Sequence, residues 1–189
     1  MKRTRTVGSV KLQLLLKAKE AALCAIKVFN DPLVHFKSES FIVLMIIAWT
    51  YLLHAYCRSK GIDYRYYTVA KKRKRYDTTK GGAKKHWELE RFLNEASCPL
   101  DGPTATNLRF LIGLRHVVEH QMALGLDSYL SGRYQACALN FNHYLKQLFG
   151  DNEGLDEHLA YSIQFVELEM DQLSKVPSTE KLPAHLRAY

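Results

Sequence analysis

The most constraining feature of this chain is a long apolar segment in its first half. Residues 41–53 are apolar except for Thr50, and the helix expected around them runs to about Ser59, before Gly61. The apolar segment is too short to span a bilayer, which takes about 20 consecutive apolar residues. We therefore predict an interior helix that is apolar nearly all round and more buried than any other element. Its expected N-cap is Ser38 or Ser40.

Further helices are expected on either side, because apolar residues recur there at helical spacing. The first, at residues 9–29, has an apolar stripe and a second face of small residues, so it should pack against two neighbours. One of these neighbours is either another helix of a bundle or another subunit. The remaining helices are predicted at residues 87–96, 107–125, 127–149 and about 156–174. Together these elements indicate an all-α helical bundle.

The length of 189 residues suits one domain with a substantial core, expected at residues 1–176 with a loose tail at 177–189. Cys24, Cys57 and Cys137 lie in apolar helical patterns, and the chain has no Cys-x-x-Cys pair. This indicates buried reduced thiols and a cytoplasmic protein, and it leaves no structural zinc motif. Charged residues soon after the basic start exclude a signal peptide. We expect a soluble protein with no membrane contact and no metal or cofactor.

The net charge of the chain is concentrated in one segment. Residues 58–91 contain 12 basic and 4 acidic residues, which accounts for the whole net charge of +8. Within the segment, residues 62–69 have the β-branched and aromatic content of a strand, and Gly81-Gly82 ends a flexible turn. We therefore predict a small basic insert, either a β-hairpin or an ordered loop. Such concentrated charge indicates a polyanionic partner.

Cations and tyrosines alternate within this insert, which suits RNA. Lysine and arginine hold phosphates, while aromatic rings stack on unpaired bases. The alternative is a solvated basic loop that attracts polyanions without specificity. The predicted RNA contacts are Lys71, Lys72, Arg73, Lys74, Arg75, Lys84, Lys85, Tyr66 and Tyr76.

The helix predicted at residues 107–125 carries the candidate catalytic residues. At about 100° per residue, Arg115, His116, Glu119 and His120 lie on the side opposite the apolar stripe. Two imidazoles, a guanidinium and a carboxylate in so short a space can perform acid–base chemistry. A solvated helix face with an Arg115–Glu119 ion pair is the alternative. Thr104 or Thr106 is the expected N-cap.

This motif and its surroundings resemble the HEPN superfamily, helical-bundle domains that include many ribonuclease toxins and defence nucleases. In that family an Arg, a following polar residue and a His four to six residues later lie on the third long helix. GLRHVVEHQ matches this pattern, with Arg115, His116 and His120 at the family positions. The segments FKSESFIVLMIIAWTYLLHAY, GIDYRYY and ACALNFNHYLKQLFG extend the resemblance over most of residues 9–150. It implies a HEPN-like up-and-down bundle carrying the basic insert.

The function implied is a metal-independent endoribonuclease, acting as a toxin or as an effector of abortive infection. The 2′-hydroxyl of the substrate would attack the adjacent phosphate. His120 would be the general base or acid, because the ordinary pKa of histidine is near neutrality. Arg115 would neutralise the nonbridging oxygens, His116 would be a second proton carrier, and Glu119 would orient a histidine or Arg115. In the family the residue after the Arg is commonly Asn, and here it is His116.

The expected partners are RNA and a second copy of the chain. Positions five apart diverge by about 140° on a helix, so Arg115 and His120 need not meet within one chain. The resemblance implies that two copies pair, so that both motifs line one cleft. An antitoxin or another regulatory partner is compatible with this class. The alternative function is a non-catalytic HEPN module that binds a nucleotide, RNA or a protein. Asn140, Asn142, His143 and Tyr144 are further polar candidates near the site, with partly exposed helix residues as the alternative interpretation.

Overall fold

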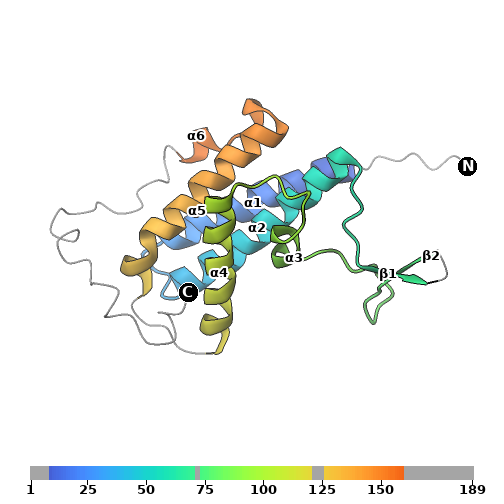
Figure 1. Ribbon diagram of the computed structural model, residues 1–189. Helices are drawn as coiled ribbons and strands as arrows, with labels where there is room; N and C mark the ends of the chain where they lie inside the picture. Colours follow the sequence, from blue (N-terminus) through green and yellow to red (C-terminus); the bar gives the residue numbers. More distant parts are fainter. Residues whose placement is uncertain (1–8, 71–72, 121–125, 160–189) are drawn as a thin grey trace, which may run out of the picture.

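Helix α2 (Lys37–Lys60) contains the apolar segment and lies at the centre of the fold (Figure 1). The computed structural model describes residues 9–70, 73–120 and 126–159. In it, α2 packs against α1 (Val10–Asn30), α3 (Leu89–Leu93), α4 (Gly102–His120) and α5 (Leu126–Phe149). Although α2 is long and apolar enough to cross a membrane, 61% of its most apolar window is buried inside the protein. This is the packing of a core helix, as predicted.

An aromatic core joins the three longest helices. Phe29 at the end of α1 meets Phe41 near the start of α2, and the two ring centroids are 5.5 Å apart. Tyr134 of α5 lies edge-on to Phe29 at 5.4 Å and tilted against Phe41 at 5.0 Å. Deeper in the fold, the Trp49 indole is fully buried, and its Nε1–H donates to Cys137 Sγ at 3.3 Å. Offset and edge-to-face rings stabilise such a core beyond their buried area.

The basic insert leaves the helices between α2 and α3. Strands β1 (Tyr67–Ala70) and β2 (Arg73–Tyr76) form an antiparallel hairpin, which stands clear of the helices in Figure 1. An isolated bridge pairs Arg65 with His86, so the chain that returns from the hairpin runs beside the chain that leads to it. A second bridge, between Thr78 and Lys84, closes a turn within the returning chain. The fold-class prediction is confirmed: the protein is mostly α-helical with a small β insert.

The predicted N-caps of two helices are wrong. In α2 the amide of Ser40 already bonds to the Phe36 carbonyl at 3.2 Å, so the helix begins at Lys37, without a side-chain cap. In α4 the cap is Asp101, whose carboxylate accepts from the Thr104 amide at 2.8 Å. Both helices extend further toward their N-termini than local sequence indicated, because tertiary packing orders an additional turn.

The short helix predicted at residues 87–96 is reduced to five residues in α3. Its first predicted residue, Trp87, is extended instead, because its amide donates to the Tyr64 carbonyl at 2.8 Å and so pairs with the insert. A last short stretch, η1 (Asp151–Glu153) and α6 (Asp156–Leu159), follows α5. Residues 160–174 of the final predicted helix lie outside the described residues, as does the tail at 177–189.

Helix α1 buries its small-residue face rather than its whole apolar stripe. Ala18, Ala22 and Ala25 are fully buried, whereas Leu12 and Leu16 are about half exposed. Small side chains on the buried side let α1 and α2 approach closely, while Leu12 and Leu16 remain on the outer side. Cys24, on the outer side of α1, is exposed, so its predicted burial is wrong, while Cys57 and Cys137 are buried free thiols as expected.

Candidate functional site

A pocket of about 460 Å³ lies between α2, α4 and the chain that leads from the insert into α3. Its floor is apolar, from Ile46 and Ile47 of α2, Leu89 of α3 and Ile112 of α4. The remaining lining is polar, charged or aromatic: Thr50, Tyr51, His54, His86, Trp87, Glu88, Glu90 and Arg115. An apolar concave surface with a few convergent polar groups is the usual form of a ligand site.

Arg115 is the residue of the predicted catalytic motif that the structure places in this pocket. It is half-buried in the wall, one turn after Ile112, so this side of α4 is not a fully solvated face. On the other side of α4, Leu108, Leu111 and Leu114 are buried in the core. A helix with one side packed in the core holds its opposite side in a defined direction. Arg115 therefore brings a cation to the pocket wall.

The remaining motif residues lie in the last turns of α4. The backbone of α4 is helical to His120, but the side chains of His116, Glu119 and His120 fall outside the described residues. Their place on the helix is therefore the one that the sequence predicts, one to five residues beyond Arg115.

His54 joins the pocket to the base of the insert. Its Nε2 lies 2.8 Å from the Trp87 carbonyl oxygen, and its ring stacks on Tyr64 with centroids 4.5 Å apart. Burial lowers the pKa of His54 to about 4, so the ring is neutral at physiological pH. A neutral ring that donates from Nε2 keeps Nδ1 as an acceptor. His54 is thus a hydrogen-bonded packing residue that also lines the pocket.

His86 is a pocket residue that the sequence analysis did not single out. It pairs with Arg65 through the backbone, and its ring lies 5.8 Å from His54 and 5.1 Å from Tyr64. Partial desolvation lowers the pKa of His86, and the positive charges of Arg58 and Arg65 lower it further. The sequence signal was the cluster His86-Trp87-Glu88-Leu89-Glu90, which places aromatic, acidic and basic groups together before a helix.

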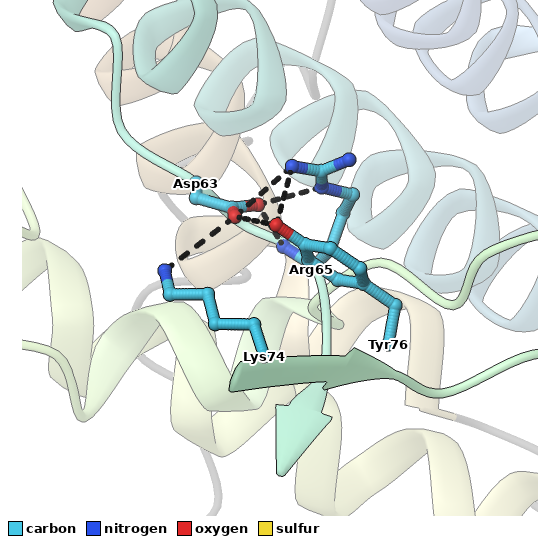
Figure 2. Close-up of polar contacts among 4 residues, drawn as sticks. All are labelled: Asp63, Arg65, Lys74 and Tyr76. Atoms are coloured by element: carbon cyan, nitrogen blue, oxygen red, sulfur yellow. Dashed lines mark hydrogen bonds and ion pairs between the residues drawn. The ribbon is translucent and has the colours of Figure 1, made fainter. Parts of the chain in front are cut away.

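A hydrogen-bonded cluster organises the base of the hairpin, as Figure 2 shows. The Arg65 guanidinium donates twice to the Asp63 carboxylate, at 2.7 and 3.0 Å. The Tyr76 hydroxyl donates to the same carboxylate at 2.9 Å and accepts from Arg65 at 2.9 Å. These hydrogen bonds, led by those from Arg65, hold the pKa of Asp63 well below its usual range. Asp63 is therefore a permanent anion within the basic segment.

The tyrosines of the insert contact its own cations. The Arg65 guanidinium lies 4.1 Å from the centre of the Tyr76 ring, and Lys84 Nζ lies 4.8 Å from it. Lys74 Nζ is 4.0 Å from the centre of the Tyr67 ring. Cation–π contacts of this kind position the cations and stabilise a small structure that lacks a large core. Tyr76 is a predicted RNA contact, and in this structure its ring and hydroxyl contact other residues of the insert: Asp63, Arg65 and Lys84.

The other predicted RNA contacts fall into three groups. Arg73, Arg75 and Lys85 are exposed. Tyr66 is half-buried, and its backbone bonds to Lys85 and Asp77 at 3.0 and 2.9 Å. Lys71 and Lys72 lie outside the described residues. The described cations therefore lie in one ordered insert. The chain that returns from its hairpin reaches the pocket at His86 and Trp87.

Two of the polar candidates on α5 have structural roles away from the pocket. The Asn142 amide accepts from the Leu155 backbone at 2.7 Å and donates to Asp156 at 2.9 Å. The Tyr144 hydroxyl accepts from the Asp101 amide at 2.8 Å. Both side chains are buried and tie chain connections to the bundle. His143, between them, is exposed, and Asn140 is half-buried outside the pocket lining.

Within residues 9–70, 73–120 and 126–159, no group of three or more His, Cys, Asp or Glu side chains is arranged to hold a metal ion. The pocket's charged groups are instead one guanidinium and two carboxylates, and its histidines contact Tyr64 and each other. This set can bind a phosphate at Arg115, donate hydrogen bonds and hold a planar ring against an apolar floor.

Comparison with known proteins gives one match, a family model described as Domain of unknown function (DUF3644), which covers residues 13–189. No curated protein matches the chain, and no solved structure matches it.

Proposed function

Since the chain belongs to the DUF3644 family, whose description assigns no activity, its function must be inferred from its own residues, and we propose that it is a metal-independent endoribonuclease with a HEPN-like site. The observation that carries this proposal is the pocket. It brings Arg115, the arginine of the Arg-x4-His motif, to the same cavity as His86 and Trp87, which follow the hairpin of the basic insert. In this proposal Arg115 binds a phosphate of the RNA that the insert holds.

The proposed reaction is attack by the 2′-hydroxyl oxygen of the substrate on the adjacent phosphorus. A base takes the hydroxyl proton, the new oxygen–phosphorus bond forms, and the bond to the 5′-oxygen breaks as an acid protonates that oxygen. Arg115 offsets the charge that develops on the nonbridging oxygens, for which its fixed charge and forked donors are suited. His120 transfers protons, with His116 as the second carrier, and Glu119 orients one of these groups.

A complete site requires two copies of the chain in this proposal. Arg115 and His120 diverge by about 140° on α4, so the two need not meet at one phosphate within a single chain. Exposed apolar side chains outside the core and outside the pocket, on α1 and α2, support a homodimer: Leu12, Leu16 and Val43. Light scattering at micromolar concentration should give twice the chain mass of 21.8 kDa. A monomer that stays monomeric with RNA present would contradict the two-copy site.

The proposed setting is the cytoplasm, where the enzyme acts as a toxin or defence effector on cellular or invading RNA. An antitoxin or another regulatory partner would restrain it. The concentrated charge of residues 58–91 supports RNA as the ligand, and the buried free thiols Cys57 and Cys137 support a reducing compartment.

A nucleotide-binding module without cleavage is the second candidate, and the size of the pocket favours it. A cavity of about 460 Å³ lies within the range of small-ligand sites, and Tyr51 and Trp87 supply aromatic surface for a base. In that case Arg115 binds a phosphate without catalysing its transfer.

Cleavage of mixed RNA in EDTA separates these two functions. The enzyme should leave 2′,3′-cyclic phosphate ends, since the substrate supplies its own nucleophile. Arg115→Ala and His120→Ala should slow cleavage by roughly 10²–10⁴-fold while RNA binding persists. Loss of affinity alone, with no cleavage by the parent protein, would favour the binding module. Products with 5′-phosphate ends would contradict the proposed chemistry.

Matched control variants come from the same helices. Arg109→Ala removes an arginine of α4 that is not among the residues lining the pocket and that donates to the Leu93 carbonyl at 2.7 Å. His143→Ala removes an exposed histidine of α5. Both control proteins should cut RNA at the parental rate. Equal loss of cleavage in control and motif variants would show that the motif has no special role.

A further inference from the structure

The pairing of β1 with β2 sorts the cations of the hairpin onto two faces. The register pairs Tyr67 with Tyr76, Thr68 with Arg75, Val69 with Lys74 and Ala70 with Arg73. Because successive side chains of a strand point to opposite sides, these pairs alternate between the faces. One face, the tyrosine face, carries Tyr67, Val69, Lys74 and Tyr76. The other, the arginine face, carries Thr68, Ala70, Arg73 and Arg75.

Lys74, the cation of the tyrosine face, and the nearby Arg65 and Lys84 are held by neighbouring groups of the insert. Lys74 Nζ lies over the Tyr67 ring and 3.7 Å from the Asp63 carboxylate. Figure 2 shows Lys74, Tyr76 and Arg65 converging on Asp63. The carboxylate offsets part of their positive charge and repels a phosphate that approaches this face. Contacts with bases are also restricted, because Arg65 and Lys84 both lie over the Tyr76 ring.

The arginine face has the opposite character. Arg73 and Arg75 are exposed, and within the described part of the chain neither guanidinium has a hydrogen bond or an ion pair. Their cross-strand neighbours, Ala70 and Thr68, are too small to cover them. Two residues apart on one strand, the arginines are separated by about 6.8 Å, a span that consecutive phosphates of an extended strand can match. Each guanidinium fork is suited to bidentate contact with a phosphate.

From this asymmetry we propose that single-stranded RNA binds through its phosphates to the arginine face, at Arg73 and Arg75, while the tyrosine face is the internal scaffold of the insert. This inference rests on the proposed function in taking RNA as the ligand. It goes further by assigning the contact to two residues and by removing Lys74 and Tyr76 from it. In this proposal RNA binds to one face of the hairpin, rather than to the positive charge of the basic segment as a whole.

Two double variants that remove the same charge test this proposal. Arg73→Gln with Arg75→Gln neutralises the arginine face, and Lys74→Gln with Lys84→Gln neutralises two cations beside the tyrosine rings. The probe is a short fluorescent single-stranded oligonucleotide with 2′-O-methyl groups, which the proposed chemistry cannot cut. Anisotropy over a salt series gives both the affinity and its salt dependence. Circular dichroism and thermal unfolding check that each variant is folded.

The arginine-face variant should lose about tenfold or more in affinity. Its slope of log affinity against log salt should fall by about 1.4, since each lost phosphate contact on a single strand accounts for about 0.7. The variant on the tyrosine face should stay within about threefold of the parent. Arg73→Lys with Arg75→Lys should restore the slope but only part of the affinity, because lysine keeps the charge and lacks the fork.

Equal losses in the two double variants would overturn the proposal, because they would show a diffuse field. A larger loss from the tyrosine-face variant would overturn it as well. The outcome is independent of catalysis, since the probe is not a substrate. If the parent protein fails to cut ordinary RNA while the arginine-face variant alone loses the probe, the endoribonuclease proposal fails and the binding face stands.

Discussion

The neutral state of His54 makes the stability of the fold depend on pH in a predictable way. The folded protein holds the pKa of His54 at about 4, whereas an unfolded histidine has a pKa of 6.5. Below pH 6.5 the His54 imidazole therefore binds a proton in the unfolded chain, whereas in the folded protein it stays neutral until the pH falls to about 4. A group with a depressed native pKa contributes stability that is fully present above its unfolded pKa and is lost as pH falls toward its native pKa.

The size of this effect follows from the two pKa values. Between pH 8 and pH 5, proton linkage at His54 alone should lower the free energy of unfolding by about 2 kcal/mol. The side chain is only 8% exposed, so solvent screens the effect little. His86 and Tyr64 lie beside it, with Arg58 over the Tyr64 ring, and His86 adds a pH dependence of its own in the same direction. The contribution of His54 therefore has to be measured as the difference between the parent protein and a variant without this imidazole.

His54→Gln is the matched variant, because glutamine keeps an N–H donor at similar reach for the Trp87 carbonyl and does not titrate between pH 8 and pH 5. Urea unfolding of both proteins at a series of pH values gives the difference directly. The parent should lose about 2 kcal/mol more than the variant on going from pH 8 to pH 5. Parallel losses, within about 0.5 kcal/mol, would refute the claim that His54 is neutral in the folded protein.

Three further predictions concern the core, the insert and the cysteines. Trp49→Phe should lower the free energy of unfolding by about 2 kcal/mol, because it leaves a void beside Cys137 and removes the indole donor; an unchanged urea midpoint would contradict this. Asp63→Asn should speed hydrogen exchange in β1 and β2 but not in α2, since two cations lose their shared anion; equal protection in the variant would contradict the scaffold role. At neutral pH a thiol reagent should modify exposed Cys24 in the native protein and reach Cys57 only after unfolding, because burial raises the pKa of Cys57 to about 12; rapid native modification of Cys57 would refute its burial.

Periodicity in the sequence was enough to predict the helices and their central member. Residues 41–53 lack charge and are apolar on every side, so a helix there has no stable place except the interior, and α2 occupies that place. The end of α2 could also be predicted from the sequence, because glycine is the usual residue at a helix C-cap. In the structure Gly61 adopts the left-handed conformation that such a cap requires. The concentration of charge in residues 58–91 is also a property of composition and needs no structure to be seen.

The sequence left the helix starts uncertain, because capping depends on the direction from which the chain enters. Ser38 has the right side chain for an N-cap, but it is buried within α2, one residue after the helix begins. Asp101 caps α4 because the preceding loop places its carboxylate 2.8 Å from the Thr104 amide. A local pattern identifies residues that are able to cap a helix, and the loop geometry selects among them.

What the sequence alone determined is therefore which segments are helical, which helix lies inside and where the positive charge is gathered. Only the tertiary structure placed Arg115 in a pocket with His54 and His86, residues separated by up to 61 positions along the chain. The strand register alone decided that Arg73 and Arg75 share a face from which Lys74 is excluded. The physical reason is that periodicity and composition are local properties, whereas a pocket and a register arise when distant segments pack, and no single segment encodes its neighbours.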